Sequence, residues 1–245
     1  MHYFASDIHL GAGTEQEARQ TEQRFVAWLD CVAEDAETVV LAGDIFDFWF
    51  EYREVVPKGF VRTLGKIAEL TDRGIRVLFF TGNHDMWCRD YFERECGVEI
   101  IRQPSVFELA GKRMFIAHGD NLNISGKPLL QLMNWGFRSP VLRTLFSWLV
   151  HPDIAMRFGQ WWSGTSRKSH AKDDITPSSL GFLIDYARNY KAQNPTTDYI
   201  LFGHMHYPYD LKESDLRLLF LGCWDGDEAT YAVMDDKGNI ELKNF

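Results

Sequence analysis

The chain has 245 residues, 45% of them hydrophobic and 25% charged, and a formal net charge of −9. These proportions are those of an ordinary folded protein, and they exclude a disordered, collagen-like or coiled-coil chain. The first residues lack the basic and apolar segments of a secretory signal, and the longest oily run, 141–150, is too short to span a bilayer. We therefore expect a single cytoplasmic domain, 1–245, whose four cysteines form no CxxC pair and stay reduced.

Short apolar runs at 3–5, 38–42, 76–80, 114–117 and 199–202 are typical of strands buried on both faces. Apolar residues at helical spacing predict a helix that starts after Pro57 and ends before Gly74. Thr176 and Pro177 predict another helix start, because they fit an N-cap followed by a first-turn proline. This alternation of strands and helices predicts an α/β layered fold. Short alternating strands are expected at 217–221, 230–234 and 240–243, with a hairpin turn at 235–238.

The segment 121–175 differs from the rest of the chain in charge and aromatic content. From 121 to 172 it holds seven basic residues and one acidic residue, a charge of +6, whereas the remainder has 19 basic and 34 acidic residues, a charge of −15. It also holds four of the eight tryptophans. Ser139-Pro140 and His151-Pro152 fit helix starts, so we expect a helical cap of three or more helices inserted into the domain. Such a cap suits an anionic, partly apolar partner, but a subdomain with core rings and solvated charges explains its composition equally well.

A polar cluster follows each of the five buried runs. In open α/β sheets ligands bind at the carboxyl ends of the strands, so these clusters are expected to converge on one site. They supply seven candidate metal ligands: Asp7, His9, Asp44, Asn83, His118, His204 and His206. Imidazole, carboxylate and amide groups without a thiolate suit Mn, Fe or Zn. Seven ligands are enough for two ions, the arrangement used to hydrolyse phosphate esters.

The local spacing of these residues also has a physical meaning. Asp7 and His9 are two residues apart, and so are His204 and His206, which puts both members of each pair on one face of an extended chain. Glycines at 43, 82, 119 and 203 allow sharp turns and a close backbone approach where each strand ends. A single cluster has a structural explanation as a turn or a cap, but five in order, each at a strand end, favour a functional site.

The ordered set D-x-H, G-D-x-x-D, G-N-H-D, H-G-D and G-H-x-H resembles the calcineurin-like metallophosphoesterase superfamily. The resemblance implies a β-sandwich flanked by helices and a site for two divalent ions, with Mn²⁺ favoured over Fe or Zn. It implies one ion held by Asp7, His9, Asp44 and His206, and a second held by Asp44, Asn83, His118 and His204. It places His84 beside the scissile phosphate, with Asp85 orienting the ring. Asp47 and Asp120 are expected to hold imidazole N–H groups or loop backbone, although turn caps explain them as well.

Within the superfamily the chain is similar to the diphosphatases of lipid A biosynthesis, through its length, residues 6–10 and 43–49, and the helical insert. The similarity implies hydrolysis of UDP-2,3-diacylglucosamine to UMP and 2,3-diacylglucosamine 1-phosphate, in peripheral contact with the cytoplasmic face of the inner membrane and without nucleic acid. His84 is a departure, because the best-known form of these enzymes has arginine there. The alternatives are a dinuclear phosphoesterase acting on another phosphodiester, nucleotide or phosphomonoester, and a non-catalytic scaffold, which the intact ligand set disfavours.

The insert is expected to bind the substrate. If 163–172 is helical, Ser166 and His170 are neighbours one turn apart, as are Lys168 and Lys172, and Arg167 lies between them. These groups would bind a diphosphate or sugar hydroxyls, although for any single one of them a solvated basic helix end is the slightly better explanation. The apolar residues of 135–149 would line an acyl groove or rest on the membrane interface.

Overall fold

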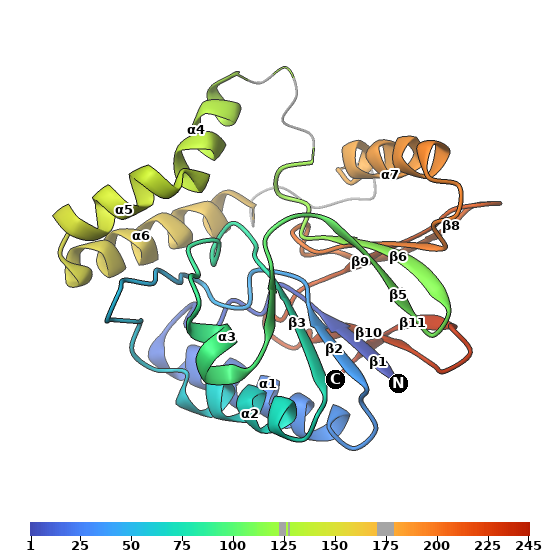
Figure 1. Cartoon of the computed structure of the whole chain (residues 1–245), viewed down its shortest axis with the longest axis horizontal. Helices are drawn as coiled ribbons and strands as arrows, with labels where there is room; N and C mark the ends of the chain where they lie inside the picture. The colour runs from blue at the N-terminus through green and yellow to red at the C-terminus, as the bar shows by residue number, and fades with distance from the viewer. Residues whose placement is uncertain (123–125, 127, 171–178) are drawn as a thin grey trace.

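The computed structural model describes residues 1–122, 126, 128–170 and 179–245, and it describes residues 130, 133 and 165–170 by their backbone alone. Two β-sheets are stacked face to face, helices cover both outer faces, and a group of helices projects at one end (Figure 1). The predicted α/β sandwich flanked by helices is therefore confirmed.

The first sheet has six described strands in the order β11-β10-β1-β2-β3-β4. The strands β1 (His2–Ala5), β2 (Thr38–Leu41), β3 (Arg76–Phe80) and β4 (Glu99–Ile101) are parallel to one another. β10 (Thr230–Met234) pairs antiparallel with both β1 and β11 (Ile240–Asn244). Because β1, β2 and β3 are parallel, the loops that follow them leave the same edge of the sheet.

The second sheet has five described strands in the order β5-β6-β7-β9-β8. The central strands β6 (Lys112–Ala117), β7 (Tyr199–Phe202) and β9 (Arg217–Leu221) are parallel. The outer strands β5 (Ser105–Leu109) and β8 (Pro208–Lys212) pair antiparallel with β6 and β9. The loops after β6 and β7 therefore also leave a common edge.

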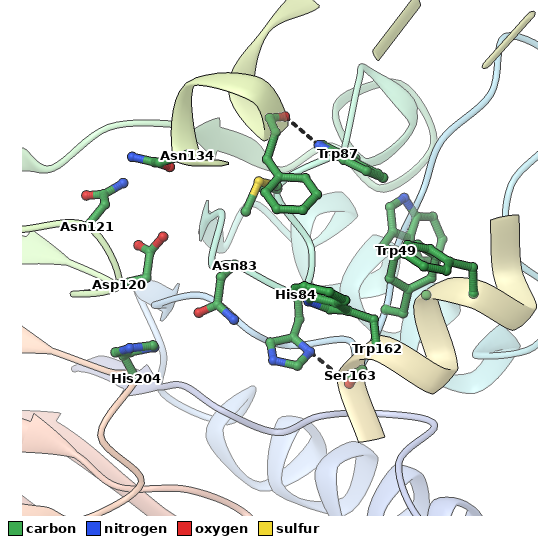
Figure 2. Close-up of a pocket in the computed structure, with 15 residues that line it drawn as sticks. Trp49, Asn83, His84, Trp87, Asp120, Asn121, Asn134, Trp162, Ser163 and His204 are labelled. Atoms are coloured by element: carbon green, nitrogen blue, oxygen red, sulfur yellow. Dashed lines mark hydrogen bonds between the residues drawn. The ribbon is translucent and has the colours of Figure 1, made fainter. Parts of the chain in front are cut away.

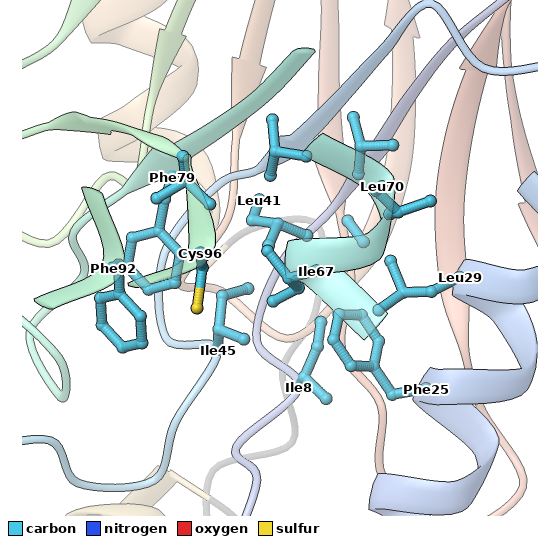
Figure 3. Packing of buried hydrophobic residues seen from close by; sticks show 14 of the residues in the cluster. Ile8, Phe25, Leu29, Leu41, Ile45, Ile67, Leu70, Phe79, Phe92 and Cys96 are labelled. Carbon is cyan, nitrogen blue, oxygen red and sulfur yellow. The ribbon is translucent and has the colours of Figure 1, made fainter. Parts of the chain in front are cut away.

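Side-chain alternation along the strands divides the core into layers. In β2, Val40 packs between the two sheets, whereas Val39 and Leu41 point to the outer face of the first sheet. There they meet α1 (Glu15–Val32), α2 (Val61–Asp72) and α3 (Tyr91–Cys96) (Figure 3). The helix predicted between Pro57 and Gly74 is α2, and it is confirmed. Burial on both faces explains why these strands are apolar at nearly every position.

The outer face of the second sheet is covered by α7 (Gly181–Gln193) (Figure 1). Leu183 and Ala187 of this helix are buried against Phe202 and Phe220 of the sheet. The N-cap of α7 is Leu180. The predicted start at Thr176 and Pro177 lies outside the described residues.

The projecting group consists of α4 (Pro128–Arg138), α5 (Pro140–Leu149) and α6 (Pro152–His170) (Figure 1). The predicted helix starts at 139–140 and 151–152 are confirmed, and the Ser139 side chain accepts a hydrogen bond from the backbone N–H of Leu142 as an N-cap. Ala155 of α6 is buried against Phe50 and Tyr52 of the sandwich, which attaches the group to the body. In the described part of the chain, no helix combines the length and apolar character needed to cross a bilayer.

Candidate metal centre

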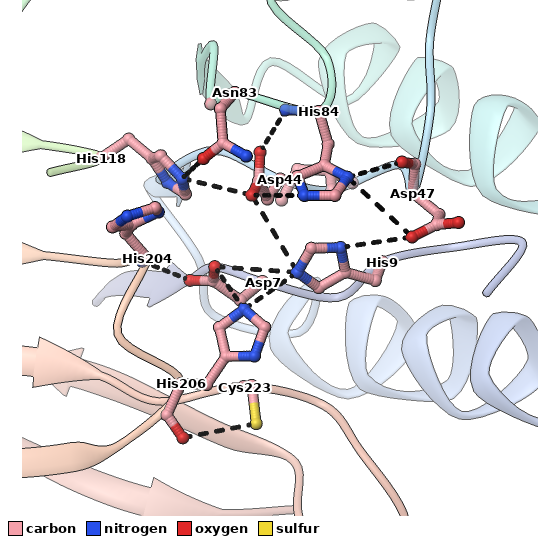
Figure 4. A network of polar contacts seen from close by, with 12 residues as sticks. Asp7, His9, Asp44, Asp47, Asn83, His84, His118, His204, His206 and Cys223 are labelled. Carbon is pink, nitrogen blue, oxygen red and sulfur yellow. Dashed lines mark hydrogen bonds and ion pairs between the residues drawn. The ribbon is translucent and has the colours of Figure 1, made fainter. Parts of the chain in front are cut away.

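The loops after β1, β2, β3, β6 and β7 meet at one edge of the sandwich (Figure 4). Three groups of side chains have ligand atoms within 4.8 Å of one another: Asp7, His9 and His206; His9, Asp44 and His84; and Asp44, His118 and His204. The seventh predicted ligand, Asn83, places Oδ1 at 3.3 Å from His118 Nε2. The fold thus brings all seven predicted residues into one cluster.

The first group joins the start of the chain to its C-terminal part. The Nε2 atoms of His9 and His206 are 3.1 Å apart. Asp7 Oδ1 lies 3.3 Å from Nε2 of His206 and 3.9 Å from Nε2 of His9. Two imidazole nitrogens and a carboxylate oxygen that face one point form a donor set suited to a divalent transition ion.

The group of Asp44, His118 and His204 is arranged around the His118 ring. Its Nδ1 atom lies 3.0 Å from the carbonyl oxygen of Ala42, which accepts a ring proton and so turns Nε2 toward the cluster. Asp44 Oδ2 is 3.3 Å from this Nε2 and 4.0 Å from His9 Nε2. Asp44 therefore lies between His9 and His118, which is the position a bridging ligand requires.

The electrostatics of the cluster favour a bound cation. Burial raises the pKa of Asp7, but the contact with His206 and the charge of His118 outweigh it and hold the pKa at about 2. Burial together with the charge of His118 lowers the pKa of His204 to about 4, which favours the neutral ring, the form that binds metals. Burial lowers the pKa of His118, but the charge of Asp44 outweighs it and keeps the pKa well above its usual value. The buried carboxylates thus attract positive charge.

The backbone at the cluster is strained. Asp7, His9, Asp44, His204 and His206 all have positive φ, between 49° and 67°, in the left-handed region. Such a conformation costs a non-glycine residue roughly 1–3 kcal/mol. The expectation that the two D-x-H and H-x-H pairs lie on extended chain was therefore wrong. Local twist, rather than strand alternation, aims these side chains.

Tertiary hydrogen bonds hold this strained backbone in place. The N–H of Asp7 donates to the Gly43 carbonyl at 3.0 Å, and the N–H of His204 donates to Asp7 Oδ2 at 2.9 Å. The N–H of His84 donates to Asp44 Oδ1 at 2.8 Å. The carboxylates therefore fix the neighbouring loops with one oxygen and leave the other oxygen in the cluster.

Two glycines make room for the cluster. Gly43 has φ of 97°, and a Cβ there would lie 2.5 Å from Nδ1 of His118. A Cβ on Gly82 would lie 2.1 Å from Oδ1 of Asp44. Any larger residue would displace a candidate ligand, which confirms the expectation of a close backbone approach at these two positions.

His84 is held by the insert as well as by the body. Its Nδ1 atom lies 2.7 Å from the Asp47 carbonyl oxygen and 2.9 Å from Ser163 Oγ (Figure 2). Ser163, buried on α6, donates its own hydroxyl hydrogen to Asp47 Oδ1 at 2.5 Å. The acceptors around Nδ1 place the ring proton there, so Nε2 faces the cluster, 3.9 Å from Asp44 Oδ2.

Asp85 has a different role from the one predicted. Its buried carboxylate accepts hydrogen bonds from the backbone N–H groups of Gly82 at 2.7 Å and Ile45 at 2.9 Å. It therefore ties the loop after β3 to the loop after β2, and the His84 ring is oriented by Asp47 and Ser163 instead. Burial, reinforced by the charge of Asp44, raises the pKa of Asp85 to about 7.

The structure describes contacts of Asp47 and Asp120, but not of the predicted substrate-binding side chains. Asp47 Oδ1 lies 3.7 Å from His9 Nδ1, on the side of the ring away from the cluster. Asp120 Oδ2 accepts a hydrogen bond from Arg138 Nη2 of α4 at 3.1 Å, so it links the insert to the body. The predicted substrate-binding residues Ser166, Arg167, Lys168 and His170 belong to α6, but their side chains lie outside the described residues, as does all of Lys172.

Two cavities open on the cluster. One, of about 260 Å³, has Asn83, His84 and His204 on its wall (Figure 2). Six aromatic side chains, Phe48, Trp49, Trp87, Phe137, Phe158 and Trp162, line it together with polar residues that include Asp120, Asn121 and Asn134, and we call it the aromatic cavity. The other, of about 810 Å³, has Asp7, His9 and His206 on its wall. Its remaining wall combines apolar residues such as Ile8 and Trp224 with the polar or charged side chains Glu17, Gln20, Thr21, Arg24, Asp225 and Glu228, and we call it the polar cavity after the latter. A ligand bound at the cluster therefore meets a wall rich in aromatic rings on one side and a wall rich in carboxylates on the other.

The cluster and the two-sheet fold define a metal-dependent phosphoesterase, and the family model for the calcineurin-like phosphoesterases matches residues 3–208. The chain belongs to this family, and it is a hydrolase.

Individual proteins similar to this chain include relatives that share one name. A protein of Porphyromonas gingivalis named UDP-2,3-diacylglucosamine hydrolase is 39% identical, over 95% of this chain and 93% of that protein. A protein of the same name from Haemophilus ducreyi is 26% identical, over 97% of each. Among solved structures, a novel archaeal phosphodiesterase is 13% identical with a TM-score of 0.48, over 100% of this chain and 99% of that one.

Proposed function

We propose that the protein hydrolyses the diphosphate of UDP-2,3-diacylglucosamine, giving UMP and 2,3-diacylglucosamine 1-phosphate for lipid A biosynthesis. The observation that carries this proposal is a metal-type donor cluster that opens directly on an aromatic cavity under the insert. A soluble substrate would not need such a cavity, whereas an acylated one does. The names of the full-length relatives support the same substrate.

Two divalent ions fit the donor set. Asp7, His9, Asp44 and His206 would hold one, and Asp44, Asn83, His118 and His204 would hold the other. We favour Mn²⁺, with Fe or Zn as the alternatives, because the donors are imidazole, carboxylate and amide groups. When bound, such a pair neutralises the charge of the phosphate and activates water for attack on phosphorus.

The protein's own groups orient the phosphate and its leaving group. His84 has its Nδ1 proton fixed by Asp47 and Ser163, so its Nε2 atom is directed toward the reacting phosphate, where it donates a hydrogen bond when protonated. The phosphate leaving group needs little protonation, so this ring stabilises charge more than it transfers a proton. Asn83 turns its side chain toward His118 and would orient the same phosphate.

The insert would bind the acylated half and the membrane. Its outward side chains include Trp135, Trp148 and Leu149, which are 65%, 74% and 81% exposed. Such rings, combined with the basic charge of the segment, suit peripheral contact with the cytoplasmic face of the inner membrane. Ser166, Arg167, Lys168, His170 and Lys172 remain our proposed contacts to the sugar or diphosphate.

Turnover assays test the substrate. Manganese-loaded protein should hydrolyse UDP-2,3-diacylglucosamine in detergent micelles and should be much slower on UDP-N-acetylglucosamine, which has the same diphosphate without the long chains. Chelation should stop the reaction and Mn²⁺ should restore it. Equal rates on the two substrates, or faster hydrolysis of a cyclic nucleotide or a phosphomonoester, would contradict the proposal and favour a general phosphoesterase.

A further inference from the structure

The two cavities reach the donor cluster from different sides. The aromatic cavity meets it at Asn83, His84 and His204, and the polar cavity meets it at Asp7, His9 and His206. Figure 4 shows Asp7 and His206 on the side of the cluster away from Asn83. Neighbouring residues of α6 line the two spaces, Ser163 the aromatic one and Gly164 the polar one. A molecule bound across the cluster would therefore extend into both.

The walls of the polar cavity are rigid before any ligand binds. One wall is the N-terminal half of α1, with Glu17, Gln20 and Thr21, and the helix begins with a complete capping box at Thr14. The facing wall is the loop 224–228. Arg24 of α1 holds this loop by donating hydrogen bonds to the carbonyl oxygens of Gly226, Asp227 and Glu228 at 2.8 to 3.2 Å. A preformed cavity lowers the entropic cost of binding.

The chemistry of these walls selects the class of ligand. Of the described residues around the cavity, Arg24 is the sole guanidinium or ammonium, and its donors are engaged by backbone carbonyls. Glu17, Asp225 and Glu228 add carboxylates to the same walls. Away from the metal cluster, such walls repel a phosphate but accept hydrogen bonds from hydroxyl and imide N–H groups. The cavity volume of about 810 Å³ is in the range of small-ligand sites.

We propose that the polar cavity binds the nucleoside half of the substrate, ribose and pyrimidine, while the diphosphate lies at the donor cluster and the acylated half enters the aromatic cavity. The inference rests on the proposed function. It assigns the two chemically different halves of one substrate to two chemically different spaces, and it makes α1 and the loop 224–228 the elements that recognise the nucleotide.

Filling the polar cavity tests the inference. Thr21→Trp places a large ring on the cavity wall, and Gln20→Trp does so one position earlier on α1. Gln23→Trp is the matched control, because Gln23 is exposed on the same helix and does not line the cavity. The probes are UMP and inorganic phosphate, titrated into manganese-loaded protein by calorimetry. Both cavity variants should weaken UMP binding at least tenfold while phosphate binding and the control stay unchanged.

Two results would overturn the nucleoside site. One is UMP binding that is unchanged in both folded cavity variants, and the other is wild-type protein that binds UMP no more tightly than phosphate. A wild type that turns over UDP-2,3-diacylglucosamine but gives either result would refute the nucleoside site alone. A wild type that binds UMP yet leaves the acylated substrate intact would refute the proposed function instead. Trp162→Ala, on the aromatic wall, should raise KM for the acylated substrate without weakening UMP binding.

Discussion

The sandwich and the insert use the same residue type in opposite ways. In the sandwich, Trp28 and Trp49 are fully buried and Trp224 is 5% exposed. In the insert, Trp148 and Trp161 are 74% and 62% exposed. Buried rings stabilise the fold that carries them, whereas contiguous exposed rings mark a surface that contacts something else. The buried rings of the body thus stabilise the fold that holds the cluster, and the exposed rings of the insert lie where the proposed membrane contact requires them.

Loss of the bridging carboxylate should have the largest effect. Asp44→Ala removes the carboxylate that lies between His9 and His118, so we expect turnover to fall below detection and metal content to fall with it. Metal analysis alongside the turnover assay measures both. Asp215→Ala, at an exposed position, is the matched control. Activity that persists in an Asp44→Ala protein without metal would disprove the assignment of this residue.

Truncation of one tryptophan in each region compares their roles directly. Trp28→Ala should lower the free energy of unfolding by about 3–5 kcal/mol, because it leaves a cavity among buried rings. Trp148→Ala should change it by less than about 0.5 kcal/mol, because that ring is exposed. Denaturant titration of both variants gives the two values. A large loss of stability in Trp148→Ala would show that the insert rings serve the fold, and the contrast between the regions would fail.

Removal of the His84 imidazole should slow the reaction without loss of the metal ions. His84→Ala should slow turnover by roughly 10²–10⁴-fold, the usual contribution of a positioned acid–base group, while both ions stay bound. His151→Ala, an exposed histidine of the insert, should behave as wild type. Concomitant loss of the ions from His84→Ala would mean that His84 is a metal ligand.

Loss of the Ser163 hydroxyl, which connects the insert to the body, should have the smallest effect on turnover. Ser163→Ala removes the hydroxyl that reaches Asp47 and His84, so the ring loses one of two partners. We expect kcat to fall by about tenfold or less through misplacement of the ring, with little change in metal content. Thr144→Ala is the control, because the Thr144 hydroxyl donates within α5 to the Pro140 carbonyl. An unchanged kcat in Ser163→Ala would show that the body alone positions His84.

The sequence predicts the buried strands and the cluster for the same reason. Strands covered on both faces are apolar throughout, so the polar run that ends each of them is conspicuous. Because the strands are parallel, the polar runs that follow them lie at the same edge of the sheet, and no other signal is needed to predict that they meet. The edge strands β4, β5 and β8 were missed, because they are short and half exposed and carry no such contrast. The helix α1 was also missed, although Phe25, Trp28, Leu29 and Val32 have helical spacing.

Other features of the site depend on contacts that the sequence does not encode locally. Ser163 and Asp47 are 116 positions apart, and only the docking of α6 on the body brings them together. The left-handed conformation of Asp7 and His204 is imposed by hydrogen bonds from remote loops. The role of Asp85 likewise depends on the backbone of Ile45, 40 positions away. Residue identity was therefore predictable, but orientation was not.

At the five cluster residues with left-handed backbone, selection for a stable fold and selection for catalysis favour different amino acids. Glycine adopts this conformation without the steric penalty that aspartate and histidine bear. In laboratory evolution for heat resistance without any demand for catalysis, the three histidine positions should be among the first to mutate, whereas Asp7 and Asp44 also hold loop backbone by hydrogen bonds. Retention of the three histidines in a population would then report that the reaction itself, rather than durability of the fold, is under selection.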